Sequence, residues 1–178
     1  MRAAFVAPTA TAVPPRRRLH RYDARWSDLF TAEQRRIAAV LATMAVAIEH
    51  VGSSAIPGLA GRREIDILVG VRPGAAVDAA VHRLSSLGYR IEQRSPPESA
   101  PWALLAKPGG IPVELLMVEH DGALWRRHVG LRDYLRESPA RALGYARLKA
   151  RWAARYGLGT PAYKPAKRQF WARISVSQ

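Results

Sequence analysis

Apolar and polar positions change their spacing along the chain, and these changes predict its secondary structure. Tyr22, Trp26 and Phe30 repeat every four positions, which is typical of one helical or turn-like face packed on a core. Thr31 is a candidate N-cap for the helix that follows. The apolar stripe of that helix comprises Ile37, Val40, Leu41 and Met44. This part of the chain therefore predicts a helix lying on a hydrophobic core.

The next hundred or so positions predict short strands joined by turns that contain glycine and proline. Glu64 to Val71 is rich in β-branched and apolar residues and predicts a buried strand. In chain order, the other predicted elements are a strand at 46–51, a loop at 57–63, a helix at 75–87, a strand at 89–92, an exposed loop at 94–101, and a hairpin of 102–107 with 111–118.

From Asp121 onward the apolar spacing becomes helical. Helices are predicted at about 122–136, 139–156 and 164–175, with Pro139 and Pro161 near helix starts, where a missing N–H costs little. The predicted fold class is α+β: a mixed β-sheet flanked by helices, followed by a helical region. We expect one domain over 21–178, with its α/β part at about 21–120 and its helical part at about 121–176.

Charge distinguishes this chain from an average globular protein. Its 178 residues contain 28 Lys and Arg against 14 Asp and Glu, a formal net charge of +14. Such an excess attracts polyanions such as nucleotides or nucleic acids, although arginine-rich residue usage is an alternative cause. Residues 1–20 mix Ala, Thr, Pro and Arg without periodicity and predict a disordered basic arm.

Several classes of protein are disfavoured by composition. No apolar run approaches the roughly 20 residues of a membrane-spanning helix, and the N-terminus lacks the compact apolar region of a secretory signal. The chain has no cysteine, so disulfide bonds are excluded. We expect a cytoplasmic protein without a membrane partner.

Candidate chemistry begins with two acids on one predicted strand. Glu64 and Asp66 are two positions apart, so their side chains would stand on the same face. Adjacent carboxylates repel each other unless a proton or cation lies between them, and Mg²⁺ prefers such oxygen ligands together with phosphate. Gly52 and Ser53 form a turn that could offer N–H groups and a hydroxyl to a polyphosphate. This combination predicts a nucleotidyltransferase site.

Several blocks of the sequence form a recognisable pattern. They are Tyr22-Asp23-x-x-Trp26-x-x-x-Phe30-x-x-Glu33, residues 49–59, Ile65-Asp66-Ile67, Arg132-Asp133-Tyr134-Leu135-Arg136-x-x-Pro139, Tyr145-x-x-Leu148-Lys149 and Tyr163-x-x-x-Lys167. Together these blocks resemble the GrpB-like family over about residues 20 to 175, a resemblance that implies a nucleotidyltransferase fold. Some members of that family are fused to dephospho-CoA kinase, which points toward nucleotide or coenzyme chemistry.

The chain departs from the family pattern at two acidic positions. The family usually has Lys-Pro-Ile-Ile-Asp where residues 62–66 are Arg-Arg-Glu-Ile-Asp, so Glu64 adds a second acid. Glu114 lies in a strand that usually carries a histidine-rich stretch, and it supplies a third acid. Active nucleotidyltransferases resemble this arrangement. We therefore expect Glu64, Asp66 and Glu114 to be catalytic and to hold one or two Mg²⁺ or Mn²⁺ ions. Alternatively, Glu64 pairs with Arg62 or Arg63, and Glu114 is a surface residue.

The remaining candidates would bind the nucleotide and its phosphates. His50 is a possible accessory residue beside the turn, and Tyr163 could stack on a base. Because adjacent residues cannot share one helix face, we expect either Arg132 or Asp133 to face the cleft while the other braces a neighbouring helix. The candidate nucleotide-binding and phosphate-binding residues are Gly52, Ser53, Ser54, Arg132, Lys149, Tyr163 and Lys167.

Two functions are compatible with these residues. The favoured one is a metal-dependent nucleotidyltransferase that moves an NMP from an NTP, with ATP as first choice, onto a small-molecule acceptor. The alternative is a non-catalytic module that binds a nucleotide or RNA in the same cleft. No known RNA-binding motif is present, so a nucleic-acid partner is not favoured.

Overall fold

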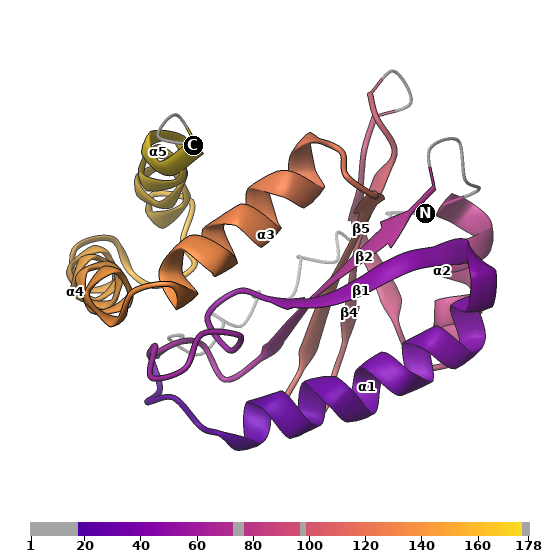
Figure 1. The fold of residues 1–178 in the computed structure, drawn as a ribbon, viewed down its shortest axis with the longest axis horizontal. Helices are drawn as coiled ribbons and strands as arrows, with labels where there is room; N and C mark the ends of the chain where they lie inside the picture. The colour runs from indigo at the N-terminus through magenta and orange to yellow at the C-terminus, as the bar shows by residue number, and fades with distance from the viewer. Residues whose placement is uncertain (1–17, 73–76, 97–98, 176–178) are drawn as a thin grey trace, which may run out of the picture.

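One mixed β-sheet with helices on both faces forms the fold (Figure 1). The structure is a computed structural model that describes residues 18–72, 77–96 and 99–175. The strands follow the order β1-β2-β5-β4-β3. They are β1 (Ala45–Val51), β2 (Ile65–Val71), β3 (Arg90–Arg94), β4 (Trp102–Lys107) and β5 (Val113–Glu119). The helices are α1 (Arg25–Leu41), α2 (Val77–Ser85), α3 (Ala123–Arg136), α4 (Pro139–Tyr156) and α5 (Tyr163–Ser175).

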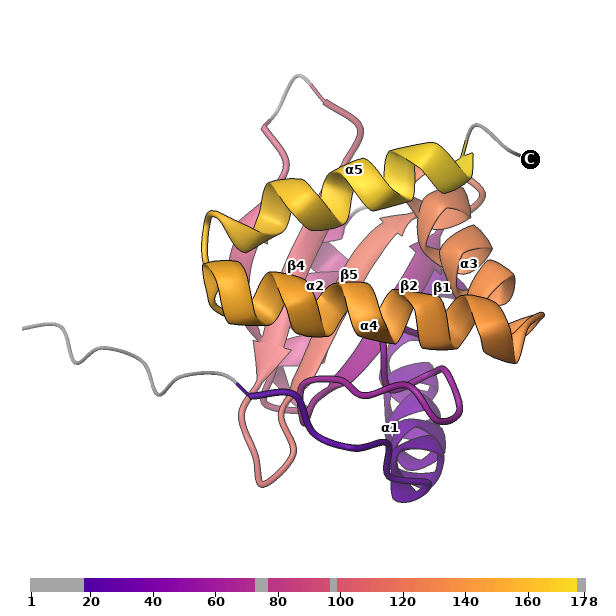
Figure 2. The same cartoon turned by 90° about the vertical axis from the view of Figure 1, so that its left-hand side faces the viewer.

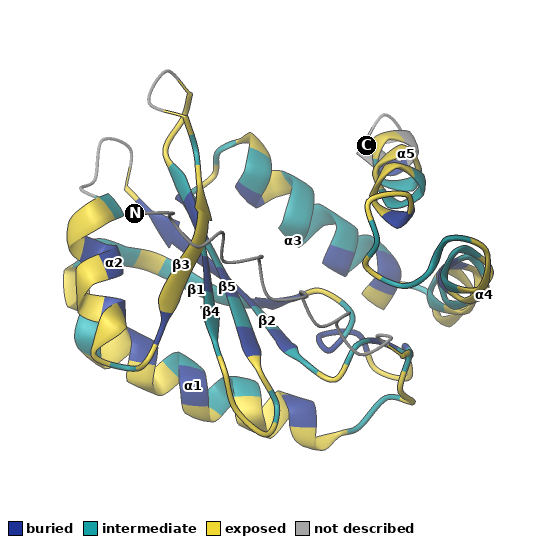
Figure 3. Cartoon of the chain, turned by 180° about the vertical axis from the view of Figure 1, so that it is seen from behind, coloured by how far each residue is buried: buried dark blue, intermediate teal, exposed yellow. Residues whose placement is uncertain are grey.

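Strand β2 pairs in parallel with β5 and antiparallel with β1. The β2–β5 register places Asp66 opposite Glu114. The predicted hairpin is confirmed, because β4 and β5 pair antiparallel around residues 108–112. At the far edge, all five residues of β3 are exposed (Figure 3).

Alternation along β2 divides the hydrophobic core between the two faces of the sheet. Ile65, Ile67 and Val69 pack in the main cluster with side chains of α1 and α2. Leu68 instead packs with Trp125 of α3 on the opposite face. A Cβ at Gly70 would lie 2.7 Å from the Trp125 ring, so this glycine allows α3 to approach the sheet closely.

Helices α4 and α5 form an outer wall beside α3 (Figure 2), and each of them contacts α3. Tyr145 of α4 and Leu135 of α3 are buried together with Ile56 and Leu59 from the loop after β1. This cluster fixes the helical wall to the loop between β1 and β2. Among the described residues, no helix is long and apolar enough to cross a membrane.

The structure corrects the predicted start of α1. The helix begins at Arg25, and Thr31 lies inside it, so the predicted N-cap at Thr31 is wrong. The Thr31 hydroxyl donates instead to the carbonyl oxygen of Ser27, one turn earlier, at 3.0 Å. Threonine hydroxyls can bond either way, which is why the residue type alone misplaced the start.

The predicted N-terminal arm, residues 1–20, is described only at its end. Residues 1–17 of the predicted basic arm lie outside the described residues. His20, which was assigned to that arm, exchanges backbone hydrogen bonds with Gly61 at 2.7 and 3.0 Å. The described chain is therefore already tied to the domain before residue 21.

Candidate functional site

Asp66 and Glu114 lie side by side on the face of the sheet turned away from α1 and α2. They are register partners on adjacent parallel strands, and both are partly buried. Both line a cleft of about 350 Å³ that is bounded on its other side by residues of α4 and α5. Glu114 is therefore not a mere surface residue. Of the three acids expected to converge, the register makes Asp66 and Glu114 direct neighbours across two strands.

The Gly52–Ser53 turn lies directly against this carboxylate pair. Gly52 has a φ of +69°, and a Cβ added there would overlap the carboxylate of Asp66. A residue with a side chain would thus be strained by its backbone conformation and would also collide with the acid. Gly52 and Ser53 both line the cleft, so the turn is close enough to offer its backbone to a ligand held by Asp66.

Lys149 of α4 reaches across the cleft to the turn. Its Nζ donates to Ser53 Oγ at 2.5 Å and to the carbonyl oxygen of Ala60 at 2.9 Å. Burial lowers the pKa of Lys149 to about 8, and the positive charge of Lys167 acts in the same direction. The structure therefore brings two predicted phosphate-binding residues, Ser53 and Lys149, into direct contact.

Helix α5 supplies Tyr163 and Lys167 to the same cleft. Burial lowers the pKa of Lys167, while the carboxylates of Asp66 and Glu114 oppose that change. Tyr163 is buried, and burial raises the pKa of its hydroxyl. Both residues thus line the same cleft as Asp66 and Glu114.

Glu64 behaves differently from the other two acids. It precedes β2 and forms an ion pair with Arg62, one of the two alternatives open from the sequence. Arg62 lines the cleft together with Asp66 and Glu114. Although burial acts against its charged form, the carboxylates of Glu64, Asp66 and Glu114 raise the pKa of the Arg62 guanidinium.

Glu64, Asp66 and Glu114 fit the expected divalent cation only in part. Carboxylate oxygens on neighbouring strands are the right chemistry for Mg²⁺. Within the described ranges, however, no group of three or more His, Cys, Asp or Glu side chains is arranged to hold a metal ion. Asp66 and Glu114 therefore suit a metal chemically, while Arg62 holds the third acid.

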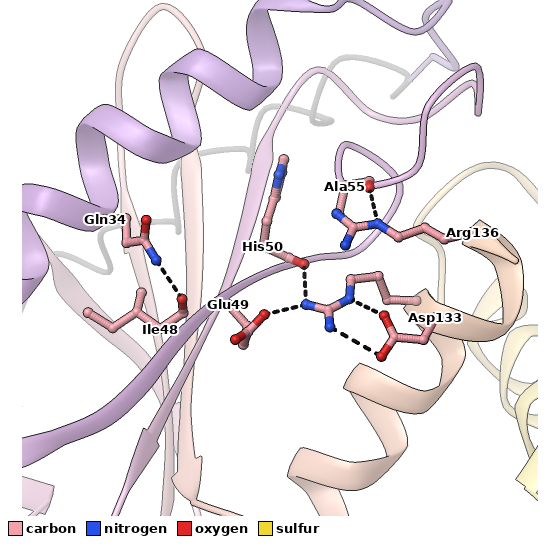
Figure 4. Close-up of polar contacts among 8 residues, drawn as sticks. Gln34, Ile48, Glu49, His50, Ala55, Asp133 and Arg136 are labelled. Carbon is pink, nitrogen blue, oxygen red and sulfur yellow. Dashed lines mark hydrogen bonds and ion pairs between the residues drawn. The ribbon is translucent and has the colours of Figure 1, made fainter.

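Arg132 donates to three neighbouring groups of the scaffold, on residues Glu49, His50 and Asp133, which are labelled in Figure 4. Its guanidinium donates to Glu49 at 2.5 Å, to Asp133 at 2.8 Å and to the carbonyl oxygen of His50 at 3.2 Å. Of the two adjacent residues, Arg132 is the one that faces the cleft, while the Asp133 carboxylate accepts from Arg132 instead of bracing a neighbouring helix. Arg132 lines the inner part of the cleft, with its donors engaged by these partners.

His50 and Ser54 are also turned into the structure. His50 Nε2 lies 3.1 Å from Ser54 Oγ, and both side chains are buried. The His50 ring stacks on Phe30, with ring centroids 4.5 Å apart. Burial, assisted by the charges of Arg136 and Arg132, lowers the pKa of His50 to about 4. The structure does not bring either side chain to the lining of the cleft.

An inner cavity of about 110 Å³ continues the cleft toward α3 and adds residues that were not singled out from the sequence. His128 Nδ1 lies 2.8 Å from the carbonyl oxygen of Leu124. Because a carbonyl only accepts, Nδ1 carries the proton. Burial lowers the pKa of His128, so its ring is neutral at pH 7 and Nε2 keeps a lone pair. In the sequence, His128 could be recognised as a residue four positions after Leu124 on the same predicted helix. That position alone did not show that its ring would line a cavity.

The amino-acid sequence is similar to those of GrpB and UPF0157 proteins. The sequence profile described as GrpB protein matches residues 17–176. A UPF0157 protein of Halalkalibacterium halodurans is 34% identical over 134 residues, which cover 74% of this chain and 67% of the relative. The chain also matches a Pseudomonas aeruginosa UPF0157 protein and spans 63% of its length.

Solved structures with a similar fold include a GrpB protein and a poly(U) polymerase. The crystal structure of GrpB from Enterococcus faecalis has a TM-score of 0.73 at 26% identity, covering 89% of this chain and 95% of that one. A structure of the Cid1 poly(U) polymerase with Mg and 3′-dATP bound has a TM-score of 0.55 at 13% identity. That match covers 83% of this chain and 49% of Cid1. The fold is that of nucleotidyltransferases.

Proposed function

The chain belongs to the GrpB family, and from its fold and its cleft we propose that it is a nucleotidyltransferase that moves an NMP from an NTP onto a small-molecule acceptor. The observation that carries the proposal is the register pairing of Asp66 with Glu114 beneath the Gly52–Ser53 turn. Both acids line a cleft that also holds the buried Lys149 and the partly buried Lys167, an arrangement that supports a role in binding phosphate.

The cleft residues divide the work of binding. The Gly52–Ser53 backbone and the Lys149 and Lys167 ammonium groups would receive the phosphates, since lysine acts on them as a point charge. Tyr163, at the start of α5, offers an aromatic ring to the base. ATP is the first nucleotide to test, because nothing in these contacts selects one base over another.

Transfer requires an acceptor hydroxyl to attack the α-phosphorus. Its oxygen forms the new bond, the bond to the β-phosphate oxygen breaks, and pyrophosphate leaves. The hydroxyl proton passes to the Asp66–Glu114 carboxylate pair, whose place in the cleft allows this role. Mg²⁺ or Mn²⁺, when bound, would neutralise charge on the transferring phosphoryl group; Asp66 and Glu114 would hold it, with Glu64 as a further candidate ligand.

The test compares nucleotide binding and turnover in matched variants. Calorimetry with ATP, GTP, CTP and UTP, in Mg²⁺ and in EDTA, should detect an NTP whose affinity is higher in Mg²⁺. Asp66→Asn should remove the metal-dependent part of binding, and Glu114→Gln should reduce pyrophosphate release more than binding. Asp28→Asn changes an exposed acid on α1 and serves as the control. Absence of NTP binding in wild-type protein would refute the proposal.

The rival function, a non-catalytic nucleotide- or RNA-binding module, is favoured by one observation. The carboxylates share the cleft with Arg62, Lys149 and Lys167, which supply positive charge without a metal. A pure binding module would bind ATP equally in Mg²⁺ and in EDTA, and it would release no pyrophosphate with any acceptor. The calorimetric comparison therefore separates the two functions.

A further inference from the structure

The Arg62 side chain lines the cleft together with three acids whose charges act on it, Glu64, Asp66 and Glu114. It pairs with Glu64, and the side chains of both are largely withdrawn from solvent, at 26% and 14% exposure. The same guanidinium borders the inner cavity together with Asp66 and Glu114. A cation fixed at this place acts on all three acids.

The backbone around Arg62 is held on both sides. Gly61, immediately before it, exchanges two hydrogen bonds with His20. After it, the Ile65 N–H donates to the carbonyl oxygen of Pro112 at 3.0 Å, at the point where β2 joins β5. A Cβ at Gly61 would meet the Ser53 side chain at 2.6 Å, so this loop also packs on the turn. Arg62 is therefore anchored at its backbone, while its side chain keeps several rotatable bonds.

The charges of the cleft balance without any ion. Four carboxylates and four cationic side chains line it: Glu64, Asp66, Glu92 and Glu114 against Arg62, Lys149, Lys164 and Lys167. A free divalent cation entering this cleft would meet the repulsion of a guanidinium at short range, in surroundings where charges are poorly screened. A nucleoside triphosphate brings negative charge. The guanidinium can donate two parallel hydrogen bonds to two oxygens of one of its phosphates.

We propose that Arg62 is a tethered cation that keeps free divalent metal out of the carboxylate site until nucleotide phosphate draws its side chain away. Metal then enters with the nucleotide. The exclusion of free metal is a property of the protein alone, whereas the movement onto phosphate rests on the function proposed above. Arg62 would be a positioning residue that makes metal binding depend on the correct ligand.

The experiment uses Mn²⁺ alone, followed by its electron paramagnetic resonance signal. Wild-type protein should leave the signal of free Mn²⁺ almost unchanged. Arg62→Gln should bind Mn²⁺ about tenfold more tightly or better, because the carboxylates lose their fixed counter-ion. Arg62→Lys should keep most of the exclusion. Arg63→Gln removes an exposed neighbour of the same charge and should behave as wild type.

Equal Mn²⁺ affinity in wild type and Arg62→Gln would overturn the proposal, and so would tight binding of free Mn²⁺ by wild type. If Arg62→Gln does not fold, which circular dichroism would reveal, tight binding of free Mn²⁺ by wild type would still overturn the proposal, and Arg62→Met would replace Arg62→Gln in the comparison. No nucleotide takes part, so failure of the proposed nucleotidyl transfer leaves this result unaffected. A separate loss of ATP affinity in folded Arg62→Gln tests the movement onto phosphate.

Discussion

Gly52 shows how a single residue makes the site possible, because it combines a positive φ with contact against Asp66. We predict that Gly52→Ala destabilises the fold by about 1–3 kcal/mol, from backbone strain and collision with the carboxylate. ATP binding by the folded variant should also weaken, since the turn must move away from the acids. Urea unfolding and calorimetry measure the two effects.

Gly144→Ala provides the control for that prediction. Gly144 is exposed on α4, and a Cβ there meets no atom within 4 Å. Alanine in a helix interior should raise stability by up to about 1 kcal/mol. If both glycine variants were as stable as wild type and bound ATP normally, the turn would have no special role.

The site residues differ in how far the sequence could reveal them. The closeness of Asp66 and Glu114 could be expected, because strand alternation is local and the resemblance placed both on neighbouring strands. Arg62 could be recognised only as one of two possible partners, since the sequence does not specify which adjacent arginine turns inward. The contacts of Arg132 could not be predicted, because its partners Glu49 and His50 lie 83 and 82 positions away.

At the scale of elements, α3 is fastened to β1 through Arg132. We predict that Arg132→Gln lowers the free energy of unfolding by roughly 1–3 kcal/mol, because Glu49 and a buried carbonyl lose a charged donor. ATP affinity of the folded variant should remain near the wild-type value. Lys149→Met, by contrast, should weaken ATP binding about tenfold or more.

Arg126→Gln is the matched control on the same helix. Arg126 is exposed and pairs with exposed Asp121 at 3.6 Å, so its loss should change stability by less than about 0.5 kcal/mol. An Arg132→Gln variant that folded with wild-type stability but failed to bind ATP would contradict the structural role given to Arg132. Arg132 would then contact phosphate, as the sequence first suggested.

Elements were easiest to predict where their ends carry local signals. Helix α4 begins at Pro139 after Ser138, whose side chain accepts from the Arg141 N–H, and it stops before Gly157 at a φ of 78°. These are capping and termination features that a sequence displays directly. At the start of α1, Ala24 makes no side-chain cap, and Asp23, one position earlier, accepts from the Arg25 N–H at 3.0 Å. This signal was present in the sequence, but Thr31 was predicted as the cap instead.

At the scale of the whole molecule, two groups of positively charged side chains among the described residues have different surroundings. Lys149 and Lys167 are directed into the cleft with the carboxylates. Arg147, Arg151 and Arg155 are exposed and follow one another at four-residue spacing on α4. Such spacing puts the three arginines on one helix face. The excess charge in the composition therefore does not by itself identify the ligand of the cleft.

This division predicts how the protein meets RNA. Single-stranded RNA should bind weakly and without sequence preference through the α4 arginines, and binding should fall steeply with salt. The triple variant Arg147→Gln, Arg151→Gln, Arg155→Gln should reduce the slope of log K against log salt by about 2, since each lost phosphate contact removes about 0.7. Its ATP affinity should stay unchanged, while Asp66→Asn should alter ATP binding and leave RNA binding intact. Fluorescence anisotropy over a salt series, alongside calorimetry, measures both. If the two variants instead weakened RNA binding equally and neither affected ATP, the cleft would be an RNA site and the transferase proposal would fail.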